Sequence, residues 1–366
     1  MLVRTLLLAF LGIVISTSGC KHRKSNDAET ESLFDGKQKE ASAPVSSKAL
    51  QLWRFMRIEA TLAEVQANCE PLRFSPPTGV PHRGTAILLH GFTACPQQFD
   101  ELGPKLAAAG YEVFVPLFPG HGAIPTSMEP RIDNTSQIPK STLGWVSFTS
   151  RVNELASLME GKKVIIGLSQ GANLALHASQ KSPTLYDKVV AIAPMLSVQF
   201  EQFTNLFSNS ISILNIDEFI MAQRNSWPKC EADTLPPANR GGFCNFENRS
   251  AIVVIEFGKM VADLAKKQAQ SGVKTKAPVQ LVISHMNDGV SNNASEELVK
   301  NMNLAGSVAK LCVMPKEVPH SMISIHDTPY VKPWNAALFQ SIEDFVTKGT
   351  FIPGSAETIT NCDIKY

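Results

Sequence analysis

The sequence predicts an α/β fold with a mostly parallel central sheet and helices on both faces. Six short apolar runs bounded by turn residues read as buried strands, and segments of helical character separate them. A serine with a glycine two residues to either side follows one of these runs and opens a helical segment. Strands that alternate with helices of this length imply right-handed crossovers and hence parallel pairing.

Each element follows from its local pattern. The predicted strands are 85–89, 111–116, 164–167, 188–193, 279–283 and 309–313. The predicted helices that connect them are 97–109, 143–159, 171–179, 295–304 and 336–347. About 280 residues after the polar N-terminal stretch are available for a core, which suits one large α/β domain.

The motif Gly167-Leu168-Ser169-Gln170-Gly171 has the spacing of a nucleophile elbow. At such a sharp strand-to-helix corner, side chains on the two flanking positions would strike a neighbouring strand or helix, so glycine is needed at both. The backbone of the central serine is strained and its hydroxyl points outward. An ordinary connecting loop would leave both glycines unexplained.

The chain resembles the α/β-hydrolase family over roughly residues 84–347. Besides the elbow, His90-Gly91-Phe92 resembles the oxyanion loop of the family. The stretch Pro116-Leu117-Phe118-Pro119-Gly120-His121-Gly122 resembles a loop of monoacylglycerol lipases and related carboxylesterases. Serine, then acid, then histidine is the chain order of the family, and Ser169, Asp288 and His320 follow it.

The chemistry assigns one role to each member of this triad. A serine hydroxyl is a weak nucleophile near neutral pH, so His320 is expected to take the proton of Ser169. Asp288 is expected to hold the imidazole in one tautomer and to stabilise its positive charge. By family resemblance, the backbone amides of Phe92 and Gln170 form the oxyanion hole.

Alternatives remain for the base and for the acid. His326 lies six residues beyond His320 and is the alternative base, although it comes just before Pro329, where the chain turns towards its last helix. Asp217 is the alternative acid, because some relatives place the acid after the preceding strand. His121 resembles a structural loop histidine of related sequences.

Several other classes of function are excluded by the sequence. No spacing of His, Cys, Asp and Glu suggests a metal site, and no glycine-rich phosphate loop is present, so no cofactor is expected. The net charge is +1 without a basic cluster, so no nucleic-acid partner is expected. Ser169 argues against the dehalogenase and epoxide-hydrolase relatives, which carry aspartate at the elbow.

The N-terminus reads as an export signal. Residues 1–19 contain one early positive charge and an apolar core too short to serve as a permanent membrane span. Thr17-Ser18-Gly19-Cys20 resembles the lipobox of bacterial lipoproteins, in which the cysteine is lipidated, although Thr17 departs from the usual leucine. Ordinary signal cleavage nearby is the alternative. Lysine at position 21 favours outer-membrane sorting by the same resemblance.

A polar tether is expected to follow the anchor and to lead into the catalytic domain. Residues 20–48 have few large apolar side chains, so they are expected to remain disordered, and the hydrolase domain is expected at 49–366. A helix over 49–67 is predicted to open that domain. Its predicted apolar face consists of Leu52, Phe55, Met56, Leu62 and Val65.

The six cysteines other than Cys20 form an even set, which in an exported protein suggests disulfides. Six cysteines allow 15 connectivities, and the sequence does not choose among them. The expected pairs are Cys230 with Cys244, Cys69 with Cys95, and Cys312 with Cys362.

An insertion between the strands at 188–193 and 279–283 resembles a cap over the active site, at about 197–249. Its phenylalanines either pack the cap onto the core or line an acyl pocket, and Phe200, Phe203, Phe207 and Phe219 are the candidate substrate contacts. An apolar cap over a serine nucleophile favours a medium-chain acyl group over a sugar or a peptide.

The sequence therefore favours a lipid-anchored serine esterase or lipase of the bacterial cell envelope that acts on medium-chain esters or acylglycerols. An acyltransferase or a thioesterase with the same triad is the alternative among enzymes. A non-catalytic lipid-binding lipoprotein of the envelope is the alternative from another class.

Overall fold

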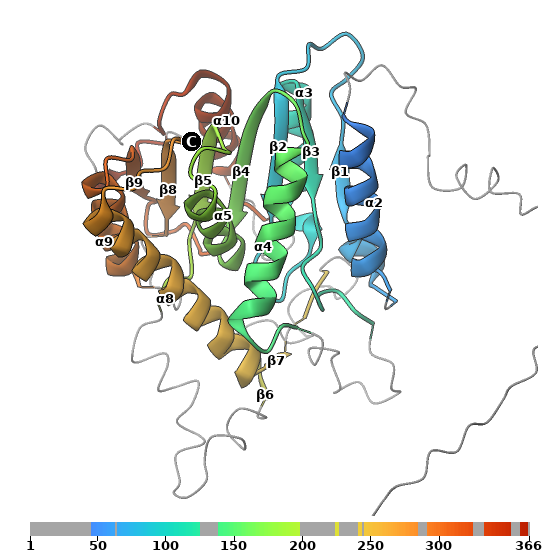
Figure 1. Cartoon of the computed structure of the whole chain (residues 1–366), viewed down its shortest axis with the longest axis horizontal. Helices are drawn as coiled ribbons and strands as arrows, with labels where there is room; N and C mark the ends of the chain where they lie inside the picture. The colour runs from blue at the N-terminus through green and yellow to red at the C-terminus, as the bar shows by residue number, and fades with distance from the viewer. Residues whose placement is uncertain are drawn as a thin grey trace, which may run out of the picture. The chain divides into compact units, whose positions relative to one another are not determined.

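An eight-stranded sheet lies at the centre of the unit formed by residues 41–366, in the order β1-β3-β2-β4-β5-β8-β9-β10 (Figure 1). The computed structural model describes residues 45–62, 64–124, 138–197, 224–226, 241–243, 245–284, 291–324, 333–352 and 359–364. All neighbouring strands are parallel except β1, which pairs antiparallel with β3. The predicted parallel sheet is therefore confirmed.

Six of the eight strands agree with the predicted runs to within two residues at each end, and the two edge strands, β1 and β10, were not predicted. They are β1 (Leu72–Phe74), β2 (Gly84–Leu89), β3 (Tyr111–Val115), β4 (Lys162–Leu168), β5 (Lys188–Ile192), β8 (Val279–Ile283), β9 (Ala309–Val313) and β10 (Ile359–Asn361). The α-helices are α2 (Ser47–Ala60), α3 (Leu102–Ala108), α4 (Thr142–Ser157), α5 (Gln170–Lys181), α8 (Asn248–Ser271), α9 (Asn292–Leu304) and α10 (Asn335–Lys348).

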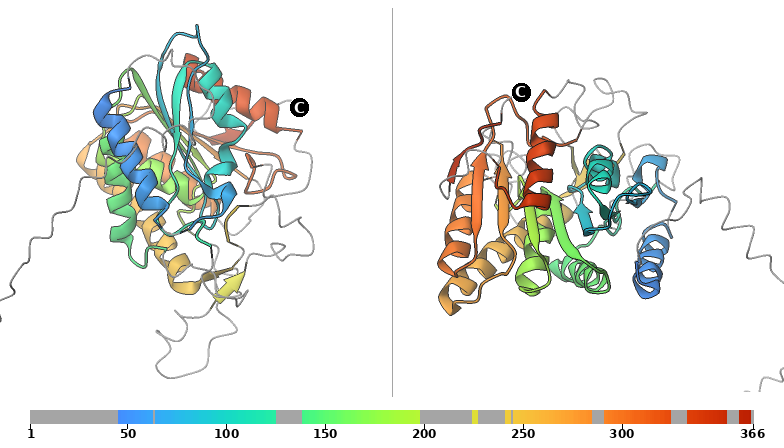
Figure 2. Two further views of the ribbon diagram at one scale, coloured as in Figure 1. Left: turned by 90° about the vertical axis from the view of Figure 1, so that its right-hand side faces the viewer. Right: turned by 90° about the horizontal axis from the view of Figure 1, so that it is seen from above.

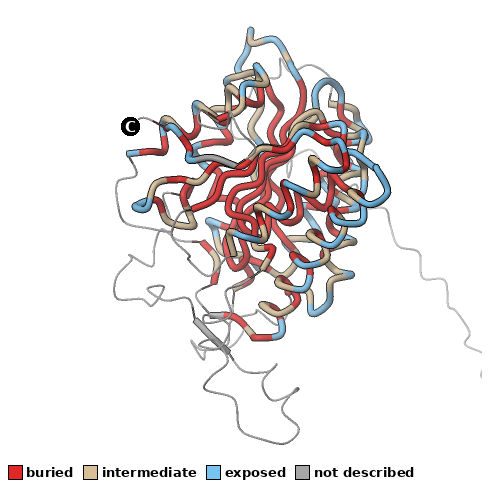
Figure 3. Tube along the Cα trace, turned by 90° about the vertical axis from the view of Figure 1, so that its left-hand side faces the viewer, coloured by how far each residue is buried: buried red, intermediate tan, exposed pale blue. Residues whose placement is uncertain are grey.

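The sheet separates two apolar cores, because successive residues of a strand point to opposite faces. Ile165 on β4 belongs to the core beneath α4, α5, α8 and α9, whereas its neighbours Val164 and Ile166 belong to the core beneath α3 and α10. Figure 2 shows α3 and α10 on one side of the sheet and the other long helices on the opposite side. The central strands are buried on both faces, as Figure 3 shows.

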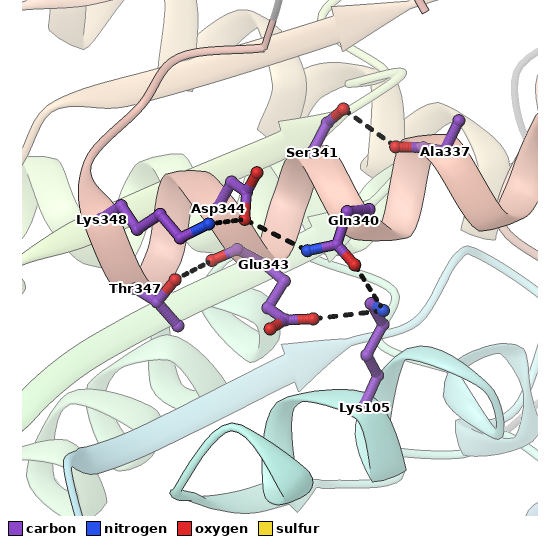
Figure 4. Close-up of polar contacts among 8 residues, drawn as sticks. All are labelled: Lys105, Ala337, Gln340, Ser341, Glu343, Asp344, Thr347 and Lys348. Atoms are coloured by element: carbon purple, nitrogen blue, oxygen red, sulfur yellow. Dashed lines mark hydrogen bonds and ion pairs between the residues drawn. The ribbon is translucent and has the colours of Figure 1, made fainter. Parts of the chain in front are cut away.

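A polar network joins the two helices of the smaller layer. Nζ of Lys105 on α3 lies 3.2 Å from a carboxylate oxygen of Glu343 and donates to Oε1 of Gln340 at 3.0 Å. Asp344 in turn accepts from Gln340 and from Lys348 on the same helix (Figure 4). These contacts lie at the solvent edge, so they orient α10 against α3 and add little stability compared with the apolar packing beneath them.

The N-terminal helix differs from its prediction. It covers Ser47–Ala60 and not 49–67, and its buried residues are Ala49, Trp53 and Met56. Trp53 makes an edge contact with Phe114 of β3, at 5.0 Å between ring centroids. The predicted apolar face was wrong at Phe55 and Leu62, which are exposed. The face is set by packing against α4 and β3, which the local periodicity does not reveal.

Several elements were absent from the prediction, and they include the long helix α8. β1 and β10 have three residues each and occupy the two edges of the sheet, and such lengths carry no detectable periodicity. A small antiparallel pair, β6 (Arg224–Ser226) with β7 (Asn245–Glu247), lies within the predicted cap. The 24-residue helix α8 then follows and contacts α5 and α9.

Two of the expected disulfides are present, Cys69–Cys95 and Cys312–Cys362. The second joins Cys312 on β9 to Cys362, the residue that directly follows β10 at the edge of the sheet. The expected Cys230–Cys244 pair lies outside the described residues, as do the signal segment, Cys20 and the tether up to residue 44. Within the described ranges, no helix is long and apolar enough to cross a bilayer.

Candidate active site

Ser169 lies at the corner between β4 and α5 with a strained backbone, φ 57° and ψ −115°. Conformations of this kind cost of order 1–3 kcal/mol and persist only where the surroundings enforce them. Here the N–H of Ser169 donates to the carbonyl of Ile192 on β5 at 2.8 Å, and its own carbonyl accepts from Ala172 at 3.0 Å. The serine is thus fixed at the carboxyl edge of the sheet.

The two flanking glycines are required by close backbone approaches, as the sequence predicts. A Cβ on Gly167 would lie 2.0 Å from the carbonyl oxygen of Gly171, and a Cβ on Gly171 would lie 1.9 Å from that of Leu89. Both distances are far inside van der Waals contact. The elbow therefore depends on a three-way contact among β4, α5 and the end of β2.

The loop over His90 to Phe92, predicted to be the oxyanion loop, reaches this corner from the end of β2. A Cβ added to Gly91 would lie 3.6 Å from Cβ of Ser169, so the loop passes directly beside the serine. Phe92 is buried here and makes edge contacts with Phe246 and His121. Gln170 is the first residue of α5, where a backbone N–H has no partner within the helix. Phe92 and Gln170 thus supply amides on two elements that meet at Ser169.

His90 is a structural residue of this loop. Its Nε2 accepts the N–H of Phe118 at 3.0 Å, and its Nδ1 lies 2.9 Å from the carbonyl of Gly91. This pattern places the proton on Nδ1. Burial, with a smaller contribution from His121, holds the pKa of His90 well below its usual range. The neutral imidazole ties the oxyanion loop to the loop after β3.

His121 also serves the packing of this region. Its Nδ1 lies 3.1 Å from the carbonyl of Pro119, and burial lowers its pKa to about 4. Its ring contacts Phe92, Phe118 and Trp145. These contacts agree with a structural histidine.

The proposed base, His320, lies in the turn that follows β9, at the same edge of the sheet as Ser169. Two contacts hold this turn: Ser284 Oγ donates to the carbonyl of Val318 at 2.6 Å, and Trp334 Nε1 donates to that of Met322 at 3.0 Å. Ser284 directly follows β8, so the two loops that follow β8 and β9 are joined where they begin.

The remaining predicted site residues lie outside the described residues. Asp288 falls within 285–290, between Ser284 and Ser291. The alternative base His326, the alternative acid Asp217 and all four candidate acyl contacts are also outside: Phe200, Phe203, Phe207 and Phe219. In the ranges that the structure does describe, no cluster of His, Cys, Asp and Glu could hold a metal ion.

An open depression of about 1080 Å³ lies away from this corner, at the amino edge of the sheet. Its lining includes Arg83, Lys162, Lys276 and Asp187, and it does not include Ser169. The helices of a parallel α/β unit point their C-termini to this edge, and cations are stabilised there. We therefore attribute its charge to the fold and place the chemistry at the opposite edge.

Comparison with known families decides the affiliation of the chain. A family model described as serine aminopeptidase, S33, matches residues 80–322. The chain belongs to this family. The match begins just before β2 and ends just after His320, so it includes the elbow and the oxyanion loop. No curated protein matches the chain.

Solved structures place this S33 family member in the α/β-hydrolase fold. A soluble variant of monoglyceride lipase from Saccharomyces cerevisiae is 15% identical, with a TM-score of 0.56 over 76% of this chain and 91% of that one. The monoacylglycerol lipase of Paleococcus ferrophilus is 15% identical, with a TM-score of 0.52 over 76% and 98%. A metagenome-derived lipolytic enzyme, from a study of LipS and LipT, is 19% identical, with a TM-score of 0.50 over 69% and 89%.

The sequence missed two groups of residues that shape the site. Gln98 and the segment Gly241–Gly242–Phe243 both hydrogen-bond to the oxyanion loop or to the residues that follow it. Gln98 is seven residues from its partner and had no motif to mark it. Gly241 is 144 residues from its partner, a separation at which a single sequence gives no signal.

Proposed function

We propose that this protein is a serine hydrolase that cleaves carboxylic esters through an acyl-enzyme. The observation that carries the proposal is the strained Ser169 at the carboxyl edge of the sheet, with the oxyanion loop beside it. Such strain in a buried corner has no role in a simple connection between a strand and a helix. It is suited to holding a hydroxyl outward for attack.

The proposed reaction assigns a role to each predicted residue. His320 takes the proton of Ser169 Oγ as this oxygen attacks the acyl carbon, and later returns a proton to the leaving alcohol. Asp288 orients and stabilises the imidazolium. The amides of Phe92 and Gln170 bind the negative oxygen of the tetrahedral intermediate, and each such donor is typically worth roughly 3 kcal/mol in the transition state. Water then resolves the acyl-enzyme.

For the substrate we propose a medium-chain acyl ester or an acylglycerol. The support is the predicted cap with its phenylalanines, together with the fold shared with monoacylglycerol lipases. If Phe207 and its neighbours contact the acyl chain, activity rises with chain length, because each buried methylene adds up to about 0.8 kcal/mol. The gain ends when the chain outgrows the site.

We further propose that the domain is held at the bacterial outer membrane by a lipid on Cys20. The support is the apolar stretch before the lipobox-like Thr17-Ser18-Gly19-Cys20, followed by lysine and a polar segment. A tether of this composition separates the lipid from the catalytic domain.

The test of the catalytic proposal is covalent labelling with a fluorophosphonate, followed by hydrolysis of p-nitrophenyl esters of increasing acyl length. Ser169→Ala should abolish both, while substitution of Ser179, a buried serine on α5, by alanine should retain both. An aminoacyl p-nitroanilide is assayed beside the esters, because the matching family model is described as a serine aminopeptidase. Preference for this amide would replace the ester by a peptide as substrate and leave the role of Ser169 unchanged.

A further inference from the structure

The oxyanion loop forms a tight turn over Gly91 to Ala94, in which Ala94 N–H donates to the carbonyl of Gly91 at 3.2 Å. Thr93 occupies its third position with φ 61°. A positive φ is unusual for a β-branched residue and persists only where neighbouring groups enforce it. The orientation of the peptide groups on either side of Phe92 therefore depends on the contacts that hold Gly91 and Thr93.

A separate hydrogen bond holds the residue on each side of Phe92. The N–H of Gly91 donates to Oε1 of Gln98 at 2.7 Å. The carbonyl of Thr93 accepts the N–H of Phe243 at 2.7 Å. The first contact is local, but the second comes from the chain that leaves the predicted cap, 150 residues further along the sequence.

The segment Gly241–Gly242–Phe243 fits closely against this loop. A Cβ on Gly242, whose φ is 108°, would lie 2.2 Å from the carbonyl oxygen of Thr93. The N–H of Gly241 donates to the side chain of Gln97. Phe246, just beyond the segment, contacts the ring of Phe92 at 5.6 Å between centroids. Glycine is thus needed at position 242 for the backbones to meet.

The Cys69–Cys95 disulfide and the side chain of Gln66 connect Gly242 back to the turn at 91–94. The side-chain amide of Gln66 pairs with Gly242 in both directions: Nε2 donates to its carbonyl and Oε1 accepts its N–H, each at 3.2 Å. Cys69, three residues after Gln66, is bonded to Cys95, which directly follows the turn. The turn is therefore enclosed by the disulfide, the Gln66 pair and the bond from Phe243 to Thr93.

We propose that Gly241–Gly242–Phe243 is a positioning element of the oxyanion hole, which fixes the Phe92 amide from the far side of the turn. This inference rests on the proposed serine hydrolase function. The segment touches no reacting atom; it acts through Thr93 by blocking the relaxation of a strained turn. Loss of the contact should let Thr93 leave its positive φ and should turn the Phe92 amide away from the oxyanion.

The experiment compares Gly242→Ala with Gly79→Ala in the full chain. Gly79 also has a positive φ, 87°, but a Cβ there would meet nothing within 4 Å, so it controls for backbone strain. Gly242→Ala should lower kcat by about 10- to 100-fold with KM nearly unchanged, because donor misplacement weakens transition-state binding. Gly79→Ala should keep kcat and KM.

Amide hydrogen exchange of a peptide that contains Phe92 to Ala94 gives a second readout that is independent of catalysis. Gly242→Ala should increase exchange there, and Gly79→Ala should not. If exchange increases while kcat is unchanged, or if neither changes in a folded variant, the positioning role is wrong. A parent protein without esterase or amidase activity would overturn the proposed function instead, and the exchange data would still report on the contact.

A milder variant keeps the test decisive if Gly242→Ala does not fold. Gln66→Met preserves the length of the side chain and removes both hydrogen bonds to Gly242. It should reproduce the faster exchange and the lower kcat in part, and Gln66→Glu, which keeps one acceptor, should lie between it and the parent. Equal kcat in all three proteins would overturn the proposal.

Discussion

The side chain of Gln98 accepts the backbone N–H of Gly91 at 2.7 Å, immediately beside Ser169. Both residues are buried, and Gly91 is the first residue of the turn that carries Phe92. A glutamine thus holds one side of the loop whose amide we assign to the oxyanion hole.

Gln98→Met should therefore reduce both the activity and the stability of the protein. The substitution leaves a buried N–H without an acceptor, at a cost of about 1–3 kcal/mol. The same change loosens the loop, so kcat should fall by about tenfold or more. Steady-state kinetics and urea unfolding measure the two effects. Gln340→Met, which alters an exposed amide on α10, is the control, and an equal response of both variants would contradict the role of Gln98.

The base is tested by comparing two histidines. His320→Ala should be as damaging as Ser169→Ala, because members of a triad act as a unit and lose several powers of ten. His326→Ala should retain most activity. Loss of activity in a folded His326→Ala protein, with activity retained in His320→Ala, would transfer the role of base.

The acid is tested by Asp288→Asn. The amide keeps the shape of the side chain but favours the wrong tautomer of the imidazole, so kcat should fall by up to about 10⁴-fold. Asp217→Asn is the matched comparison, since it is the alternative acid. Measured kcat values that rank the two variants in the opposite order would assign the acid to Asp217.

The elbow glycines make a prediction about stability. Gly171→Ala should destabilise the fold by at least about 2 kcal/mol, because the new Cβ meets a carbonyl oxygen that belongs to a central strand. Gly272→Ala has a positive φ of 67° and nothing within 4 Å, so it should lose only about 1 kcal/mol. Urea unfolding of both variants measures the difference, and similar losses would mean that β2 can move.

Burial of His177 predicts that acid weakens the fold. Burial, and to a smaller extent Lys181, lowers the pKa of His177 to about 4. The unfolded chain binds that proton near pH 6.5, so between about pH 6.5 and pH 4 the unfolded state holds more protons and the free energy of unfolding falls as pH falls. The loss from this residue should be about 2 kcal/mol between pH 6.5 and pH 5.

Urea unfolding at these two pH values measures the effect. His177→Asn keeps a polar atom for Thr149, which lies 2.8 Å from Nδ1 of His177, but cannot titrate. Its stability should depend less on pH than that of the parent, with the remaining dependence supplied in part by His121. An unchanged pH dependence would show that His177 is not the titrating group.

The sequence alone determined the six longer strands of the sheet and the strand-to-helix corner at Ser169. Buried parallel strands must be nearly continuous apolar runs, so β8 and β9 were predicted to the residue. The elbow could be recognised from its two glycines. A Cβ atom at Gly167 or at Gly171 would lie within 2.0 Å of a backbone carbonyl oxygen, and only glycine avoids this contact. Both signals are carried by residues that are close in the sequence, so a short stretch of sequence contains each of them.

Only the tertiary structure decided what surrounds Ser169. The Thr93 carbonyl meets the Phe243 amide, and Gln66 meets Gly242 across 176 residues of sequence. The exposed side of α2 was likewise fixed by α4 and β3, which left Phe55 in solvent. Such pairings use ordinary backbone groups and glutamines that could bond to many partners. Which partner each one meets depends on how the folded elements pack, and no short stretch of sequence specifies that.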